Sequence, residues 1–553
     1  MIMFKTKLLY LIFSACFLLI IAKLFYIQVI NPRGLPTDYL RTNKIFPERG
    51  KIFDRSRQPL VVNQTTYLLY AEPKKISNYD YYSVKISEAL KTDPASIEAK
   101  FDQTKDWVAV KSGVDKETKN QIESFKLDGI GLQNEAKRYY PEASLSAHLL
   151  GFVGKNEVGD SLGYFGIEGF YDKDLTGMPG LVKTERDLFG RPIFVGTQQK
   201  LASENGRDLL LTLDKSVQEI IKSKLIQGLE KYEAKQGCVI VANPMTMEIL
   251  GLVCLPDFDP DQYYRFSEDY FKNTGISDLY EPGSIFKPIV MATALEKNII
   301  KPDDTYDEAG PVIIGEYSIK TWNDKYEGKI TMTRILEKSS NVGMVYIGQK
   351  LGNKKLYQGI KEFGFGQLTG IDLQGEVSGY LKPEKDWYQI DFATASFGQG
   401  IAVTPIQMIT AFSAIINGGS LYKPYVVSRL ISSNKENEVK PKLIRKIISE
   451  KTSKEMVKML ISTVERGDAS WIKPKGYQIG GKTGTAQIAI KGHYDPTKTI
   501  ASFIGFVPTQ NPKFIALVVL KEPQTSPWGS ETAAPLFFDI AKELIVYYNI
   551  APE

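Results

Sequence analysis

The apolar segment near the N-terminus constrains this chain more than any other stretch. Residues 8–22 are uninterrupted apolar or small residues, and a second apolar run follows Lys23 as far as residue 30. A segment of this length can cross a bilayer as a helix if the Lys23 side chain extends toward an interface. No clear small-x-small cleavage site follows. We therefore expect an uncleaved membrane anchor over residues 8–30, with a cleaved signal peptide as the alternative.

Basic residues indicate the side of the membrane on which this segment begins. Residues 1–7 form a short tail that carries Lys5 and Lys7. Lysine and arginine are enriched on the cytoplasmic side, and long domains are translocated largely regardless of their charge. We expect residues 1–7 to be a cytoplasmic tail and the bulk of the chain to lie on the outer side of the membrane.

Length, charge and histidine content exclude several classes of protein. The 553 residues leave room for two or three domains. The chain has 69 Lys and Arg against 64 Asp and Glu and no long basic run, so we expect no nucleic-acid partner. The two histidines, His148 and His493, are far apart and lack the spacing of a zinc site. We therefore expect no metal, no cofactor and no histidine base.

The three cysteines form no Cys-x-x-Cys pair. Cys16 lies in the apolar N-terminal segment, whereas Cys238 and Cys254 lie in apolar, strand-like runs. The main interpretation is that Cys238 and Cys254 are small core residues. A disulfide between them is the alternative.

Turn residues and changes of pattern divide the rest of the chain. Residues 31–44 contain two prolines and a glycine and are typical of a linker. Residues 45–205 contain short strand-like runs at 60–62 and 67–70, split by turn residues, and no chemical constellation. This pattern favours a non-catalytic pedestal of mixed α and β structure. A second domain is expected over residues 206–553.

The domain over residues 206–553 combines strands and helices. Residues 209–213 predict a strand, and Asp214 can cap the amphipathic helix that follows. Thr404 and Gln407 have the spacing of a capping box at the start of an apolar helix. Further strands are predicted over residues 237–242, 249–255, 477–490, 500–507 and 514–520, and a closing helix over 536–548. This order favours an α/β or α+β fold in which helices cover a sheet.

Ser284 and Lys287 are the first candidate catalytic residues. They stand three residues apart, directly after Pro282 and Gly283. A serine hydroxyl is a weak nucleophile without a base beside it, and residues at i and i+3 share one face of a helix. Pro288 is tolerable only within the first turn, so the helix should begin near Ser284. The pattern predicts a nucleophile and its base on one turn, although the four residues alone are more often a solvated helix surface.

Two further motifs follow in the same domain. Ser339 and Asn341 form a Ser-x-Asn triplet, and Lys482, Thr483 and Gly484 form a Lys-Thr-Gly triplet on a strand-like run. Each motif alone is weak, and a helix cap is the alternative role for Ser339. Ser-x-x-Lys, Ser-x-Asn and Lys-Thr-Gly in this order are shared by penicillin-binding proteins and serine β-lactamases.

The sequence resembles a class B penicillin-binding protein, a membrane-anchored peptidoglycan D,D-transpeptidase, over nearly its whole length. Asn341 favours the division-specific branch, since elongation-type relatives often carry an aspartate at this position. The family's pedestal and catalytic motifs are matched at residues 49–55, 138–141, 166–168, 363–366, 396–400, 482–486 and 502–506.

The resemblance implies an architecture and a location. It implies a transpeptidase domain over residues 206–553, with an antiparallel sheet covered by helices and a helical subdomain, similar to the serine β-lactamases. It implies a dimerisation-type pedestal over residues 45–205 and a single pass through the bacterial inner membrane. The catalytic domain would then face the periplasmic or extracytoplasmic side.

The resemblance also implies a role for each motif residue. Ser284 would attack the carbonyl between the terminal D-alanines of a stem peptide, and Lys287 would take its proton. Ser339 would relay a proton to the departing amine, and Asn341 would hold the peptide and Lys287. Lys482, Thr483 and Thr485 would bind the terminal carboxylate, while Gly484 would let the substrate approach closely. The backbone amides of Ser284 and Thr485 would form the oxyanion hole.

The expected partners are the stem peptides of lipid-linked nascent glycan, β-lactams as covalent inhibitors and a membrane-embedded glycosyltransferase of the division apparatus. The function implied is septal cross-linking, with D,D-carboxypeptidase activity as a minor reaction. The alternatives are an elongation-type transpeptidase, a division scaffold without catalysis, and a β-lactam hydrolase. A hydrolase would need a residue that activates water, for which Glu376 is the candidate.

Overall fold

The protein is described here by a computed structural model, in which the chain forms two compact units. Residues 1–48 and 176–206 make one unit, and residues 49–175 and 207–553 make the other. The residues described are 2–30, 40–157, 159–185, 199–433, 435–490 and 493–552.

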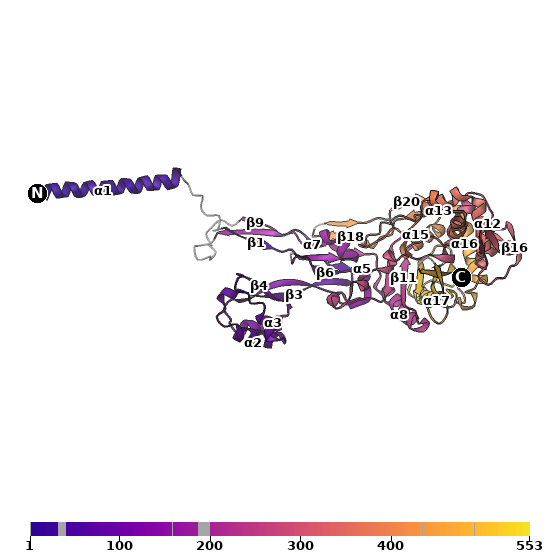
Figure 1. Ribbon diagram of the computed structural model, residues 1–553, viewed down its shortest axis with the longest axis horizontal. Helices are drawn as coiled ribbons and strands as arrows, with labels where there is room; N and C mark the ends of the chain where they lie inside the picture. Colours follow the sequence, from indigo (N-terminus) through magenta and orange to yellow (C-terminus); the bar gives the residue numbers. More distant parts are fainter. Residues whose placement is uncertain are drawn as a thin grey trace. The chain divides into compact units, whose positions relative to one another are not determined.

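The first unit begins with the long apolar helix α1 (Ile2–Phe25), which continues into a π-helical turn, η1 (Tyr26–Ile30). The segment Thr6–Ile30 is long and apolar enough to cross a membrane, and its side chains are not buried by the rest of the protein. The predicted N-terminal apolar helix is therefore confirmed. Figure 1 shows it as the indigo helix at the N-terminal end of the chain.

A small antiparallel sheet completes the first unit. Strand β8 (Gly180–Glu185) pairs with β1 (Leu40–Ile45) on one side and with β9 (Gln199–Leu201) on the other. The expected linker over residues 31–44 is therefore wrong at its end, because residues 40–44 belong to a strand that is held by its ladder with β8. Residues 31–39 lie outside the described part of the chain.

In the second unit, one sheet joins the expected pedestal to the expected catalytic domain. Strand β10 (Asp208–Leu211) pairs in parallel with β2 (Ile52–Phe53) and antiparallel with β18 (Val427–Ser432). The remaining strands of this sheet are β3 (Pro59–Ala71), β4 (Val108–Val114), β5 (Ile130–Tyr139) and β19 (Lys435–Glu438). Backbone hydrogen bonds therefore cross the expected boundary near residue 206, and the pedestal strands share a rigid sheet with the residues that follow.

Strand β3 corrects the expectation of two short runs split by turn residues. It is a continuous strand of 13 residues. Residues 62–71 pair antiparallel with residues 130–139 of β5 over their whole length. Of the polar residues between the two apolar runs, Gln64 and Thr65 are exposed whereas Thr66 is buried, and all of them pair with β5 in the ladder.

A buried ionic cluster holds the pedestal strands to the helix that follows them. Glu168 in α6 (Gly166–Phe170) is fully buried and accepts hydrogen bonds from Arg49 Nε and Arg138 Nε, each at 2.8 Å. Arg49 also forms an ion pair with Asp172 at 2.9 Å. Three motifs that lie far apart in the sequence therefore meet around one carboxylate.

Substitution of Glu168 by glutamine is expected to destabilise the protein strongly. It leaves two buried guanidinium groups without their shared anion, which typically costs about 3–5 kcal/mol. The measurement is the thermal unfolding temperature of the detergent-solubilised protein.

The matched control is Glu436→Gln. Glu436 also accepts from two arginines, Arg57 and Arg429, but all three side chains are exposed. Removing such surface pairs is expected to change the stability by less than about 1 kcal/mol. An equal loss of thermal stability in both variants would contradict the importance of the buried cluster.

The second unit also contains a five-stranded antiparallel sheet with the order β12-β11-β23-β22-β21. The strands are β11 (Gln236–Ala242), β12 (Ile249–Leu255), β21 (Gly480–Ile490), β22 (His493–Val507) and β23 (Phe514–Lys521). Alternate residues of β11 enter two different cores: Val239 and Val241 face one, whereas Ile240 and Ala242 face the other. Both faces of the sheet are therefore buried, which explains the continuous apolar runs.

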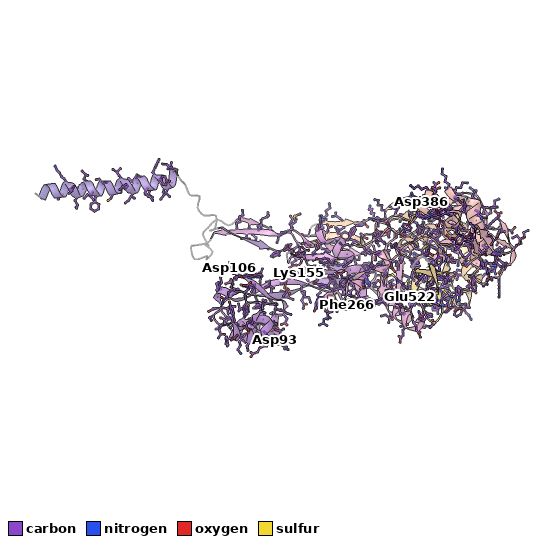
Figure 2. All side chains as sticks on the ribbon, in the orientation of Figure 1. Asp93, Asp106, Lys155, Phe266, Asp386 and Glu522 are labelled. Atoms are coloured by element: carbon purple, nitrogen blue, oxygen red, sulfur yellow. A yellow bond between two sulfur atoms is a disulfide. The ribbon has the colours of Figure 1, made fainter. Side chains whose placement is uncertain are left out.

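Helices cover both faces of this sheet. Helices α8 (Lys215–Tyr232) and α17 (Ala533–Tyr547) pack on one face, and α10 (Lys287–Glu296) and α15 (Pro405–Ile416) pack on the other. Figure 1 labels α8, α15 and α17 near the strand labelled β11. Figure 2 labels Glu522, which follows β23 and pairs with Lys235 at 3.7 Å. The predicted helix-covered antiparallel sheet is confirmed.

Local signals placed the helix starts correctly. The Asp214 carboxylate accepts from the backbone N–H groups of Ser216 and Val217 at the start of α8. Thr404 and Gln407 form the predicted capping box at the start of α15. Cys238 and Cys254 are buried core residues, as predicted, and they also form the disulfide that was the alternative, because they occupy opposite positions of β11 and β12.

A helical subdomain lies beside the sheet. It contains α11 (Met332–Glu337), α12 (Asn341–Leu351) and α13 (Asn353–Glu362), and α10 and α16 (Glu450–Arg466) pack against it. Strand β13 (Thr305–Glu308) pairs with β16 (Gly328–Thr331) next to these helices. The site described below lies where this subdomain meets the edge strand β21.

Candidate active site

Ser284 lies on a 3-10 turn, η7 (Gly283–Phe286), and α10 begins at Lys287 with Pro288 in its first turn. The predicted helix start is confirmed. Gly283 has φ of +54°, and a Cβ atom here would lie 2.9 Å from the carbonyl oxygen of Thr485. A glycine is therefore required for the turn to approach β21 so closely. Among the described residues, the Ser284 hydroxyl has no hydrogen-bond partner, which leaves it available to a substrate.

Lys287 joins the first two motifs. Its side chain is fully buried, and its Nζ lies 2.5 Å from the Ser339 carbonyl oxygen, 2.8 Å from Asn341 Oδ1 and 3.1 Å from Ser339 Oγ. A neutral lysine amine has two N–H donors and one lone pair. The carbonyl and amide oxygens can take the two donors, and the lone pair can then accept from the Ser339 hydroxyl.

The turn that carries Ser339 has an uncommon backbone conformation, and the buried Glu308 holds the residues on both sides of Ser339. Ser339 has φ of +56°, an uncommon conformation for a residue with a side chain. The next residue, Ser340, caps α12 and donates its hydroxyl to the fully buried Glu308, which also pairs with Lys338 at 2.6 Å. Sequence analysis missed Glu308, because it lies on β13 and nothing in its neighbourhood resembles a motif.

Electrostatics favour a neutral Lys287. Burial lowers its pKa well below the usual value, and the nearby charge of Lys482 lowers it further, against the opposing effect of Asp468 and Glu308. Burial also lowers the pKa of Lys482 to about 8, again opposed by Asp468. Both effects favour the neutral amine of Lys287, the form that can act as a base, whereas Lys482 remains largely protonated near neutral pH.

Strand β21 carries the third motif. Lys482 is only 1% exposed, and its Nζ contacts Oγ1 of Thr483 at 3.2 Å and the Thr483 carbonyl oxygen at 3.1 Å. The Thr485 hydroxyl oxygen accepts from the backbone N–H of Gly529 at 2.9 Å, so its own proton remains free to donate. Threonine hydroxyls, rather than the lysine itself, therefore face the open space, and the positive charge lies behind them.

Gly484 corrects part of the sequence analysis. A Cβ atom at this position would lie 2.4 Å from Ser502 Oγ and 2.9 Å from the Ile285 side chain. The missing side chain makes room for β22 and for the turn that carries Ser284, not for a substrate. The same packing requirement applies at Gly481, where a Cβ atom would lie 2.6 Å from the Ile504 carbonyl oxygen.

These elements enclose a hollow of about 150 Å³. It is lined by predicted residues from all three motifs: Ser284, Ser339, Asn341, Thr483 and Thr485. Lys287 and Lys482 are not part of the lining, but Lys287 contacts Ser339 and Asn341, and Lys482 contacts Thr483. Ser284 and Thr485, whose backbone amides are the predicted oxyanion hole, both line the hollow.

Five lining residues were not found from the sequence: Trp322, Asp468, Trp528, Ser530 and Glu531. Trp322 and Trp528 contact each other in the wall of the hollow, with ring centroids 5.2 Å apart and planes inclined by 59°. Asp468 follows α16 and adds a negative charge near both lysines. No local pattern marks any of them, because they come from loops that only the fold brings together.

Glu376 does not fit the role of a water-activating base. Its carboxylate accepts hydrogen bonds from the backbone N–H groups of Thr369 at 2.7 Å and Gly370 at 2.9 Å, and from the Thr369 hydroxyl. It therefore closes a local turn, and it does not line the hollow that contains Ser284. Glu376 is therefore not positioned to activate a water molecule for a hydrolase mechanism at Ser284.

Family models match most of the described second unit. Residues 237–542 match the penicillin binding protein transpeptidase domain, and residues 44–211 match the penicillin-binding protein dimerisation domain. The first match contains all the motif residues described above. The second spans the pedestal strands and the Glu168 cluster.

Characterised relatives cover nearly the whole chain. Stage V sporulation protein D of Bacillus subtilis is 34% identical, with 97% of this chain and 84% of that protein aligned. Peptidoglycan D,D-transpeptidase FtsI of Escherichia coli is 30% identical, with 97% and 91% aligned. A peptidoglycan synthetase from Bifidobacterium adolescentis has a similar structure, with 27% identity, a TM-score of 0.75 and coverage of 93% and 98%. The chain belongs to the penicillin-binding protein family of transpeptidases, with a dimerisation domain before its transpeptidase domain.

Proposed function

We propose that this chain is a membrane-anchored peptidoglycan D,D-transpeptidase that cross-links stem peptides of the septal wall through an acyl-enzyme on Ser284. The observation that carries the proposal is the environment of Lys287. Its buried Nζ lies within 3.1 Å of Ser339 and Asn341, one helical turn from Ser284. A lysine without charge, held between the motif residues, is the base that a serine nucleophile requires.

In the acylation step, Ser284 Oγ attacks the carbonyl carbon between two D-alanines, and its proton passes to Lys287. Ser339 lines the hollow and contacts Lys287, so its hydroxyl can carry protons between the hollow and the base. The C–N bond breaks, and D-alanine leaves after taking a proton by the same route. The amides of Ser284 and Thr485 would stabilise the oxyanion; one such donor contributes on the order of 3 kcal/mol.

Recognition of a free carboxylate is assigned to β21. Thr483 and Thr485 present hydroxyl groups to the hollow, and Lys482 supplies positive charge through Thr483. Charge-assisted hydrogen bonds of this kind select a chain end over an internal peptide bond. A β-lactam carries a carboxylate at the matching position and would acylate Ser284 in the same way.

The remaining segments fit a role in wall assembly. The proposed domains are a cytoplasmic tail (1–7), an anchor (8–30), a linker from residue 31 to the start of β1, a non-catalytic pedestal up to 205 and a transpeptidase domain from 206. The transpeptidase domain would face the periplasmic or extracytoplasmic side, where lipid-linked glycan is polymerised. Neither matched family model describes glycan polymerisation, so we propose a membrane-embedded glycosyltransferase of the division apparatus as partner.

A role in sporulation is the second candidate, because one relative with 34% identity is a stage V sporulation protein. Depletion of the protein in its own host separates the possibilities. Filaments with incomplete septa are expected if the protein acts in division, and wild-type protein but not Ser284→Ala should restore them. Rounded, swollen cells would instead indicate elongation, and normal growth with defective spores would indicate sporulation.

A further inference from the structure

A second hollow, of about 490 Å³, opens next to the catalytic one. The two share Trp322 and Asp468 in their linings, so these two residues border both hollows. The walls come from the loop before β16, from α11 and from the C-terminal end of α16. The proposed donor peptide occupies the first hollow, and nothing described above occupies the second.

Most charged groups around the second hollow are already paired. Arg334 pairs with Glu327 at 2.9 Å and with Glu337 at 3.2 Å, and Lys338 pairs with the buried Glu308 at 2.6 Å. Because the charges of Arg334 and Lys338 are balanced by these carboxylates, we do not assign a ligand to either residue.

Three charged residues of the wall differ from these pairs. Lys325 and Arg466 are cations and Asp468 is an anion, and the Lys325 side chain has neither an ion pair nor a hydrogen bond within the described part of the chain. Arg466 is the last residue of α16 and is exposed, and within the described part of the chain it has neither an ion pair nor a hydrogen bond. Asp468 stands two residues later, where the hollows meet, and also has no ion pair within 4 Å among the described residues. The hydroxyl of Tyr326, also in this wall, is buried without a partner. The second hollow therefore offers two cations, an anion and an unsatisfied hydroxyl, and Arg466 is the cation that lies two residues from the anion.

We propose that this hollow binds the acceptor of the transpeptidation, and that the reacting amine stands on a carbon that also carries a free carboxylate. Asp468 attracts the ammonium group at the junction with the catalytic hollow, and Arg466 binds the carboxylate through its guanidinium. This acceptor chemistry is that of a diamino dicarboxylic acid, as opposed to a lysine side chain, which has an amine alone. The inference rests on the proposed function, because it assigns the second substrate of that reaction.

The resolving step balances without any further reactant. The acceptor ammonium first loses a proton to solvent, and its nitrogen lone pair then attacks the carbonyl carbon of the Ser284 ester. A C–N bond forms and the bond between that carbon and Ser284 Oγ breaks. The second proton of the amine passes through Ser339 and Lys287 to Ser284 Oγ, which restores the hydroxyl.

The test compares two acceptors that differ only in the carboxylate. The full-length protein in detergent is acylated with a thioester analogue of the donor peptide, and its aminolysis is measured with D-alanine and with D-alaninamide. The ratio of the two rates is expected to fall about tenfold in Arg466→Gln, as for a lost hydrogen bond to a charged group. The difference in basicity between the acceptors cancels when variants are compared, and Arg466→Lys should retain part of the preference.

Lys458→Gln is the matched control, since it removes one positive charge from an exposed position of the same helix. Its ratio is expected to equal that of the wild type. An unchanged ratio in Arg466→Gln, or an equal fall in Lys458→Gln, would overturn the inference. Penicillin acylation of Ser284 is measured in parallel: if it is absent in the wild type, the proposed function itself fails, whereas acylation without a preference for D-alanine refutes the acceptor site alone.

Discussion

Replacing Ser284 by alanine is expected to abolish covalent labelling by a fluorescent penicillin and to lower the cross-linking rate on the order of 10⁶-fold. The substitution removes the only atom assigned to carry the acyl group. It should leave the fold intact, because Ser284 is only half-buried and its hydroxyl has no hydrogen-bond partner among the described residues. The measurements are gel fluorescence after labelling and the rate of cross-linked product formation.

Ser530→Ala is the control for this variant. Ser530 lines the same hollow, but among the described residues no lysine forms a hydrogen bond with its hydroxyl. Covalent labelling should therefore persist in Ser530→Ala. Equal labelling of the wild type and Ser284→Ala would refute the assignment of the nucleophile.

Substitution of Lys287 by methionine is expected to slow acylation by about 10²- to 10⁴-fold, the usual contribution of a general base. Methionine has a similar shape and fills the buried space, but it cannot accept the proton of Ser284. The variant leaves Asn341 Oδ1 and the Ser339 carbonyl oxygen without the donor they now share. The measurement is the second-order rate constant of penicillin acylation, and a rate within a factor of about three of the wild type would contradict the base assignment.

The pH dependence of the same reaction gives an independent check on Lys287. Because burial lowers the pKa of Lys287, the amine is neutral above that pKa, and acylation should be lost as the pH falls through it. Lys482 must keep its proton to attract a carboxylate, so binding should weaken as the pH rises through about 8. The wild type should therefore show a bell-shaped profile. In Lys287→Met the acid limb should disappear while the alkaline limb remains.

The motif residues could be predicted from the sequence because each motif is short and local. Ser284 and Lys287 share one turn, and Ser339 and Asn341 flank the start of α12, so their spacing alone relates them. Trp322, Asp468 and Trp528 come from separate loops and carry no local signal. Their position depends on tertiary packing, which cannot be predicted from the spacing of residues along the chain.

The role of Gly484 and the sheet at the proposed pedestal boundary both depend on residues that are distant in the sequence. The role of Gly484 depends on what its missing side chain would touch, and those atoms belong to Ser502 and Ile285 on other elements. The pedestal boundary depends on the pairing of β10 with β2, whose partners stand more than one hundred and fifty residues apart. Strand patterns predict that a strand forms, but they do not identify its partner across such a distance.

The disulfide illustrates a choice that the pattern left open. Cys238 and Cys254 each lie in an apolar run, which suits a core residue and a bonded cysteine equally well. Only the register of β11 and β12, in which the two residues are opposite each other, separates these interpretations.

The central claim is that Ser284 forms an acyl-enzyme which an amine, not water, resolves. The most direct measurement is rapid-quench mass spectrometry of the wild-type protein with a donor ending in D-Ala-D-Ala and with D-alanine as acceptor, followed by peptide mapping. The account predicts a transient acyl group on Ser284 and its conversion mainly to the amide product. An acyl group on another residue, or hydrolysis of penicilloyl-Ser284 within seconds, would contradict it.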